Sequence, residues 1–249
     1  MSYTVVIDPG HAPGNKNKGN NGYYEYKGMW LLSNFLKEAL LRCGFNVKLT
    51  RSENEDPSLE ARGKLAASIN ADLFISEHSN AANGKARGVE VYYSLQRPND
   101  LAFASILSSV VATVMHNPDR GPKTKKGEGG KDYYGVIRSA ADGGVKHIFL
   151  IENGFHDNSE DEAFLLKTSN LKGIAEIQAE AICLLFNVKY IKEEDEKSNG
   201  SIPQWQLDGL DNLIRDKVIE DETYWKNRFT QNITVGEVIG LMGKAVGNK

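Results

Sequence analysis

Three short apolar runs, each ending in a polar side chain, constrain the fold of this chain most strongly. They read TVVIDPGH over residues 4–11, DLFISEH over residues 72–78 and HIFLIE over residues 147–152. Runs of this length and β-rich composition are typical of buried strands. Since helical sequence patterns separate them, we expect an α/β fold, with a mostly parallel twisted sheet flanked by helices on both faces and a small C-terminal helical segment.

The polar ends of these runs are expected to meet at one edge of the sheet. In open α/β sheets, side chains at the carboxyl ends of strands converge although they are far apart in sequence. His11, His78 and Glu152 occupy such ends, and Glu25 lies between a loop rich in Gly and Asn and a helix. Two imidazoles and a carboxylate suit zinc with a position left for water, and a further carboxylate can serve as general base. We therefore expect His11, Glu25 and His78 to hold Zn²⁺. Glu152 is then the expected catalytic base.

Each of these residues also has a simpler interpretation. Glu25 could merely complement the dipole of the helix that follows it. A single histidine at a strand end is more often a hydrogen-bonded structural group, although a second such histidine reverses that preference. Glu152 could belong to a buried salt bridge, but its apolar neighbours would also raise its pKa toward values useful for acid-base catalysis. Asn80 could bind substrate, orient His78 or serve only as a turn residue.

Several segments occur in the order that is typical of one enzyme family. They are VVIDPGH, a downstream Glu before a long helix, VKLTR, LEARGKLAASINADLFISEHSNA and FLIENGFHDNSED. The ordered set resembles the zinc-dependent N-acetylmuramoyl-L-alanine amidases of the type-3 class, found in cell-wall autolysins and phage endolysins. The resemblance covers roughly residues 1 to 188. It implies a hydrolase that cleaves the amide bond between N-acetylmuramic acid and L-alanine in peptidoglycan, with the zinc ligands and the catalytic glutamate at the positions given above.

Three charged residues within these segments are not assigned to the site. Glu77 departs from the family pattern, which usually has an apolar residue before the histidine, and strand alternation directs it away from His78. It could support a ligand or bond a group outside the pocket. Arg51 and Arg62 match recurrent family positions, but an arginine that bridges a loop carboxylate is the simpler explanation.

The remaining patterns predict the other elements of the fold. We expect strands over residues 45–50, 88–93 and 133–138, helices from Asp56 and over residues 98–116 and 171–188, and loops over residues 119–132 and 139–144. The first of these loops is rich in cationic residues and glycines, and we expect it to be solvated, mobile and near the cleft. His116 and His147 are excluded as ligands because they lie at a helix end and at the opposite end of a strand.

Composition divides the chain into three segments. Residues 1–188 are the expected catalytic domain, residues 189–201 are a charged linker, and residues 202–249 contain two short helical patterns. The last segment loosely resembles one degenerate unit of surface-layer-type wall-binding modules. It could target the wall, pack on the catalytic domain or mediate self-association.

Charge and hydropathy limit the partners and the location that we expect. A net charge of −3 gives no overall cationic field for nucleic acid. There is no leader-like start and no apolar run long enough to span a bilayer, so we expect a soluble protein that stays in the cytoplasm until its release to the wall. Cys43 and Cys183 are expected to be packed thiols.

A phage endolysin is therefore the favoured interpretation. A bacterial autolysin, a sporulation or germination amidase, a zinc peptidase or deacylase, and a non-catalytic wall-binding protein on the same fold are the alternatives.

Overall fold

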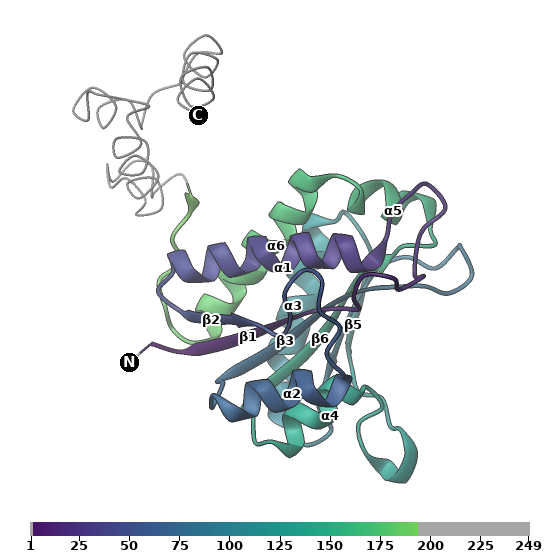
Figure 1. Ribbon diagram of the computed structural model, residues 1–249. Helices are drawn as coiled ribbons and strands as arrows, with labels where there is room; N and C mark the ends of the chain where they lie inside the picture. The colour runs from purple at the N-terminus through teal and green to yellow at the C-terminus, as the bar shows by residue number, and fades with distance from the viewer. Residues whose placement is uncertain (1, 194–249) are drawn as a thin grey trace, which may run out of the picture. The chain divides into compact units, whose positions relative to one another are not determined.

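A six-stranded sheet lies at the centre of the computed structural model, which describes residues 2–193 (Figure 1). The strand order is β2-β1-β3-β6-β4-β5. Strands β2, β1, β3 and β6 run parallel to one another. Strand β4 is antiparallel to β6, and β5 is parallel to β4. The strands are β1 (Thr4–Pro9), β2 (Asn46–Leu49), β3 (Leu73–Asn80), β4 (Val89–Tyr93), β5 (Asp119–Lys123) and β6 (His147–Phe155).

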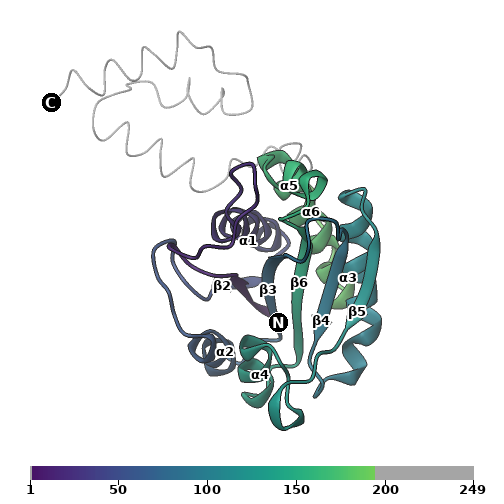
Figure 2. The ribbon, with the colours of Figure 1, turned by 90° about the vertical axis from the view of Figure 1, so that its right-hand side faces the viewer.

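Helices cover both faces of this sheet (Figure 2). The described helices are α1 (Glu25–Arg42), α2 (Leu59–Ser68), α3 (Leu101–Val114), α4 (Gly135–Asp142), α5 (Ser159–Leu165) and α6 (Thr168–Leu185), with short 3-10 turns η1 (Pro98–Asp100) and η2 (Glu128–Gly130). Helices α2 and α4 pack together on one face, and α1, α3 and α6 cover the other. The predicted fold class is confirmed for the described residues.

Burial on both faces explains why the central strands are continuous apolar runs. Val5, Val6 and Ile7 of β1 are fully buried, as are Leu73, Phe74 and Ile75 of β3. Parallel strands covered by helices on both sides need apolar residues at successive positions. The polar residues that follow these runs are therefore left at the carboxyl ends of β1, β3 and β6, along one edge of the sheet.

A glycine allows the end of β1 to approach β3 closely. Gly10 donates its backbone N–H to the carbonyl oxygen of Glu77 at 2.9 Å. A Cβ at residue 10 would overlap this oxygen and the ring of His78. The Asp8-Pro9-Gly10 turn thus brings His11 beside His78 because residue 10 lacks a side chain.

Residues 133–144 correct two expectations. Helix α4 (Gly135–Asp142) contains most of the predicted strand 133–138 and most of the predicted loop 139–144. Val136, Ile137, Ala140 and Ala141 are buried at the spacing of one helix face and pack in the cluster that contains Phe74 and Ile148. The aromatic and β-branched composition of this segment favoured a strand locally, and the packing against α2 and the sheet outweighs that preference.

The predicted loop 119–132 is also partly wrong, because it begins with edge strand β5 and contains η2. Charged residues and proline are tolerated on an edge strand. Arg120 and Lys123 of β5 pair with Glu90 of β4, with N–O distances of 2.6 and 3.4 Å. Cross-strand ion pairs thus stabilise a segment whose composition suggested a loop.

Two further helix boundaries differ from those expected. Helix α2 begins at Leu59 and is capped by Ser58, whose Oγ accepts the N–H of Ala61 at 3.2 Å, so Asp56 is not the cap. Helix α5 was not predicted. It is a single short element capped by Asn158.

Of the described residues, 2–190 belong to one compact unit. Most of the predicted linker 189–201 and the whole of the predicted module 202–249 lie outside them. Within residues 2–193, no helix has the length and apolar character required to traverse a bilayer. Cys43 and Cys183 are buried and form no disulfide in the described part of the chain, which confirms their prediction as packed cysteines.

Candidate metal centre

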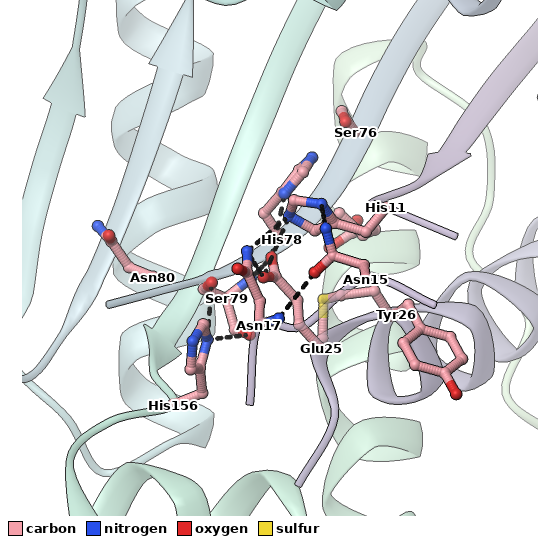
Figure 3. A network of polar contacts seen from close by, with 12 residues as sticks. His11, Asn15, Asn17, Glu25, Tyr26, Ser76, His78, Ser79, Asn80 and His156 are labelled. Atoms are coloured by element: carbon pink, nitrogen blue, oxygen red, sulfur yellow. Dashed lines mark hydrogen bonds and ion pairs between the residues drawn. The ribbon is translucent and has the colours of Figure 1, made fainter. Parts of the chain in front are cut away.

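Three residues with metal-ligating side chains meet at the carboxyl edge of the sheet (Figure 3). His11 follows β1, Glu25 is the first residue of α1, and His78 lies in β3. Glu25 Oε2 is 3.1 Å from His11 Nε2, and Glu25 Oε1 is 3.1 Å from His78 Nδ1. The three ligand atoms lie within 4.8 Å of one another. The structure therefore brings together the three residues that the sequence predicts as a ligand set.

The donor set fits a zinc ion in chemistry and in spacing. Two imidazoles and one carboxylate form a common three-residue catalytic zinc site. Ligands about 2.0 Å from a tetrahedral ion are separated by roughly 3.3 Å, which is close to the two contacts of Glu25. The imidazole rings of His11 and His78 lie edge to face with centroids 5.0 Å apart.

Two loop asparagines hold the cluster in place. Asn15 Nδ2 is 2.9 Å from His11 Nδ1, and Asn17 Nδ2 donates to Glu25 Oε2 at 2.9 Å (Figure 3). Asn17 also accepts the backbone N–H of Glu25 on its carbonyl, at 3.1 Å. The sequence predicted only a loop for this segment, and these contacts were not predicted. Turn formation alone explains asparagines in such a loop. The sequence therefore gives no sign that one of them lies next to a candidate ligand in space.

A carboxylate distant in sequence fixes the same loop. Glu162 of α5 is fully buried and accepts the N–H groups of Asn20 and Asn21 at 3.0 and 2.7 Å. It also accepts the N–H of Tyr23 at 3.3 Å. These bonds lower the pKa of Glu162 against the effect of its burial. Glu162 thus sets the position of the residues that lead into Glu25.

Arg62 fixes the turn before His11. Its Nη1 donates to Asp8 Oδ1 and to the carbonyl of Pro9, both at 2.9 Å, and its Nη2 donates to the carbonyl of His11 at 3.1 Å. Arg51 Nε donates to the carbonyl of Pro9 at 3.1 Å. Both arginines are buried. Arg62 pairs with the carboxylates of Asp8 and Asp56, which agrees with the simpler interpretation, whereas Arg51 bonds only backbone carbonyls among the described residues.

The contacts of Glu25 change the protonation of the cluster. Burial alone would raise the pKa of Glu25, but hydrogen bonds with His11 and His78 lower it well below its ordinary value. Burial would likewise lower the pKa of His78, but its bond to Glu25 and that negative charge raise the pKa to about 9. A histidine must be neutral to bind a metal ion, so an ion at this site competes with the proton on His78.

Glu152 lies beside the cluster on the next strand. Its Cα is the partner of His78 in the parallel β3–β6 register, and the residue is 7% exposed. Burial raises the pKa of Glu152 to about 7. Its Oε2 has no hydrogen-bond partner and the side chain forms no ion pair among residues 2–193, so the structure does not place Glu152 in a buried salt bridge. A buried carboxylate without a partner is poised to accept a proton from a molecule in the cleft.

The cluster and Glu152 line a cleft of about 970 Å³. Asn80 and Tyr134 also line it, from the β3 end and from the start of α4. Asn80 Nδ2 donates to Glu90 Oε2 at 3.4 Å and its Oδ1 accepts the N–H of Ala81, so it does not orient His78 through a hydrogen bond. Its position leaves a contact with a bound substrate as the role to test.

Glu77 and His147, which the sequence did not assign to the site, lie away from this cleft. Glu77 points to the opposite face, where its Oε2 accepts hydrogen bonds from Asn153 Nδ2 and Gln178 Nε2 at 2.8 and 3.3 Å. The structure therefore answers the question left open for Glu77, which bonds groups outside the pocket. His147 Nδ1 is 2.7 Å from Asp100 Oδ1 at the far end of β6, as expected from its exclusion.

Comparison with protein families and curated proteins gives one consistent result. A model of the N-acetylmuramoyl-L-alanine amidase family matches residues 5–183. The N-acetylmuramoyl-L-alanine amidase CwlM of Bacillus licheniformis is 29% identical over 186 residues, which cover 74% of this chain and 69% of the relative. The endolysin of Bacillus phage SPP1 is 32% identical over 216 residues, which cover 82% of this chain and 71% of the relative.

Solved structures show the same similarity. The catalytic domain of CwlV, an N-acetylmuramoyl-L-alanine amidase from Bacillus (Paenibacillus) polymyxa var. colistinus, matches with a TM-score of 0.66 and 26% identity. The match covers 75% of this chain and 99% of the CwlV chain. The described α/β unit thus corresponds to a complete catalytic domain of the relative.

Proposed function

Because the chain belongs to the N-acetylmuramoyl-L-alanine amidase family and is a peptidoglycan amidase, we propose that it works with zinc and that one buried glutamate moves the proton. His11, Glu25 and His78 hold the ion, and Glu152 is the catalytic acid-base residue. A zinc ion held there would polarise the scissile carbonyl and lower the pKa of water. The observation that carries this assignment is the convergence of three donors beside a buried carboxylate whose Oε2 has no hydrogen-bond partner within residues 2–193.

The residues of the chain divide the remaining work. With a pKa of about 7, Glu152 is deprotonated in a large fraction of molecules near neutral pH and can accept a proton from the attacking water. The same group then donates the proton to the departing amine of L-alanine. Glu25 stays ionised because its pKa lies well below neutrality, so it is not available for this transfer. Glu25 and Glu152 therefore have separate roles.

Asn80 is proposed as a substrate contact. It lines the cleft beside the cluster, and its amide is held by Glu90 and by the N–H of Ala81. A fixed amide at the cleft wall can bond a peptide group of the substrate. Asn80→Ala should raise KM more than it lowers kcat if this contact is made only through binding.

The experiment that tests the mechanism uses purified protein and muropeptides. Zinc should be present at one ion per chain by elemental analysis, a chelator should abolish hydrolysis, and zinc should restore it. The product should carry a new free amino group on L-alanine. Active protein without stoichiometric metal would refute the zinc assignment, and release of an amino group from another residue would instead indicate a zinc peptidase.

A role as a phage endolysin is proposed for the biological setting. The similarity to the SPP1 endolysin extends over a larger share of this chain than the similarity to CwlM. An endolysin acts on the wall after its release to it. Expression inside a bacterial host should therefore cause lysis only when a membrane pore is supplied, whereas lysis or wall turnover without a pore would favour an autolysin.

A further inference from the structure

Lys125, a cation near the cleft, has no carboxylate partner among the described residues. The segment between β5 and α4, residues 124–134, forms an arm that extends past α4 (Figure 1). Of the cations on β5, Arg120 and Lys123 pair with Glu90. Lys125 at the start of the arm is exposed and forms no ion pair with any residue from 2 to 193.

Two aromatic rings hold the ammonium of Lys125 in a defined position. Its Nζ lies 3.8 Å from the ring centroid of Tyr133 and 5.7 Å from that of Tyr134. The two rings pack edge to face at 5.3 Å, and the N–H of Tyr133 donates to the carbonyl of Lys125 at 2.9 Å. A cation held over aromatic faces keeps its other side free for an anion.

Hydrogen bonds at the base of the arm fix the position of the Lys125 backbone. Asp132 is buried and accepts the hydroxyl of Ser94 and the N–H of Leu95, both at 2.8 Å. Lys126 and Asp132 form an isolated bridge that closes the arm. The arm therefore presents Lys125 from a fixed backbone.

Lys125 acts on the charge of the neighbouring cleft. Tyr134 lines the cleft together with Glu152 and Glu25, and the charge of Lys125 partly offsets the rise in the pKa of Glu152. Arg62 also lines the cleft, but it is paired with Asp8. Lys125 is thus placed to attract an anionic group of a substrate that enters the cleft.

We propose that Lys125 binds a carboxylate on the peptide part of the substrate, at the residue that follows L-alanine. This proposal rests on the proposed function. The carboxyl group of muramic acid is consumed in the scissile amide, so the anionic groups of the substrate belong to the peptide. The carboxyl of alanine is likewise consumed in the next peptide bond. The first position that can carry a free α-carboxylate is therefore the second residue, where a dicarboxylic amino acid is linked onward through its side-chain carboxyl. Lysine binds such a group as a point charge.

The test compares two synthetic muropeptides that differ only in this residue, which carries either a free α-carboxylate or its carboxamide. We expect the wild-type protein to prefer the free acid. Lys125→Met should raise KM for the acid by about fivefold, the effect of one partly exposed charge pair, and leave kcat and the amide substrate nearly unchanged. Lys125→Arg should retain the preference.

Lys131→Met is the matched control. Lys131 is exposed on the same arm and the substitution removes the same charge, but no aromatic ring holds it among the described residues. Equal losses for the acid and the amide, or equal effects of Lys125→Met and Lys131→Met, would overturn the proposal and indicate a nonspecific charge effect. Hydrolysis of neither muropeptide by wild-type protein would overturn the proposed function as well, so the two failures are distinguishable.

Discussion

Two glutamates at the ends of adjacent central strands have similar acidity and opposite surroundings. Glu77 of β3 and Glu152 of β6 are both buried, and burial raises the pKa of each to about 7. Glu77 faces α6, and the amide groups of Asn153 in β6 and Gln178 in α6 donate to its Oε2. Glu152 faces the cleft, and one of its oxygens has no partner among the described residues.

The difference shows that a raised pKa does not by itself identify a catalytic carboxylate. His78 and Glu152 are Cα partners in the β3–β6 register, and Glu77 is one residue earlier in β3. A shift of one position moves a strand side chain to the other face of the sheet. Burial acts on both groups alike, and only access to the cleft separates their functions.

The largest expected effect is on the metal. His78→Ala removes one of three donors from the cleft face, and we expect loss of stoichiometric zinc and no measurable hydrolysis. Elemental analysis and a muropeptide assay on the same preparation would show this, with circular dichroism to establish folding. Retention of one zinc per chain by the folded variant would indicate that another group is the ligand.

Removal of the cleft carboxylate should have the next largest effect. Glu152→Gln preserves size and should retain zinc, but loss of proton transfer should lower kcat by about two to four orders of magnitude. Glu77→Gln is the matched control because it makes the same change in a group of the same pKa on the core face. We expect its kcat within about threefold of the wild-type value. Similar losses in both variants would mean that the two faces do not differ in function.

The sequence predicted the part of this comparison that depends on strand ends. His11, His78 and Glu152 were placed at one edge because each follows an apolar run, and alternation directed Glu77 away from His78. The partners of Glu77 could not be predicted, since Gln178 lies 101 residues away in a helix whose facing was unknown.

The same reason explains the other failures of prediction. The bond from Glu162 to Tyr23 joins residues 139 positions apart. Helix α4 was expected as a strand because its packing partners on α2 and in the sheet include residues far away in the sequence. Local composition predicts where a run begins and ends, and it contains little information about contacts between distant elements.

The core-face carboxylate should make its own contribution to the pH dependence of stability. Because the folded pKa of Glu77 is raised from 4.5 to about 7, its protonated form is favoured in the folded protein. Its contribution to stability is fully present below about 4.5 and is lost as the pH rises to about 7. A shift of this size corresponds to about 3 kcal/mol.

Urea unfolding of wild type and Glu77→Gln between pH 4.5 and 8 measures this contribution. The wild-type free energy of unfolding should fall relative to that of the variant over this range and then level off. Glu152 is present in both proteins, so its own titration cancels in the difference. A difference that does not change with pH would mean that Glu77 is ionised throughout and compensated by its amide partners.

The smallest effect concerns competition between the metal and a proton on the cleft face. With the pKa of His78 raised to about 9 by Glu25 in the metal-free protein, most molecules carry this proton at neutral pH. Metal binding must release it, so affinity should fall by up to about tenfold for each pH unit below about 9. Competition titrations with a chromogenic chelator at pH 7, 8 and 9 would measure the slope, together with proton release in an unbuffered solution. Glu77→Gln should show the same slope, because Glu77 lies on the other face of β3 and is no ligand. Affinity that is independent of pH in both proteins would mean that His78 is already neutral before the metal binds. Its contact with Glu25 would then be a hydrogen bond from a neutral imidazole to the carboxylate.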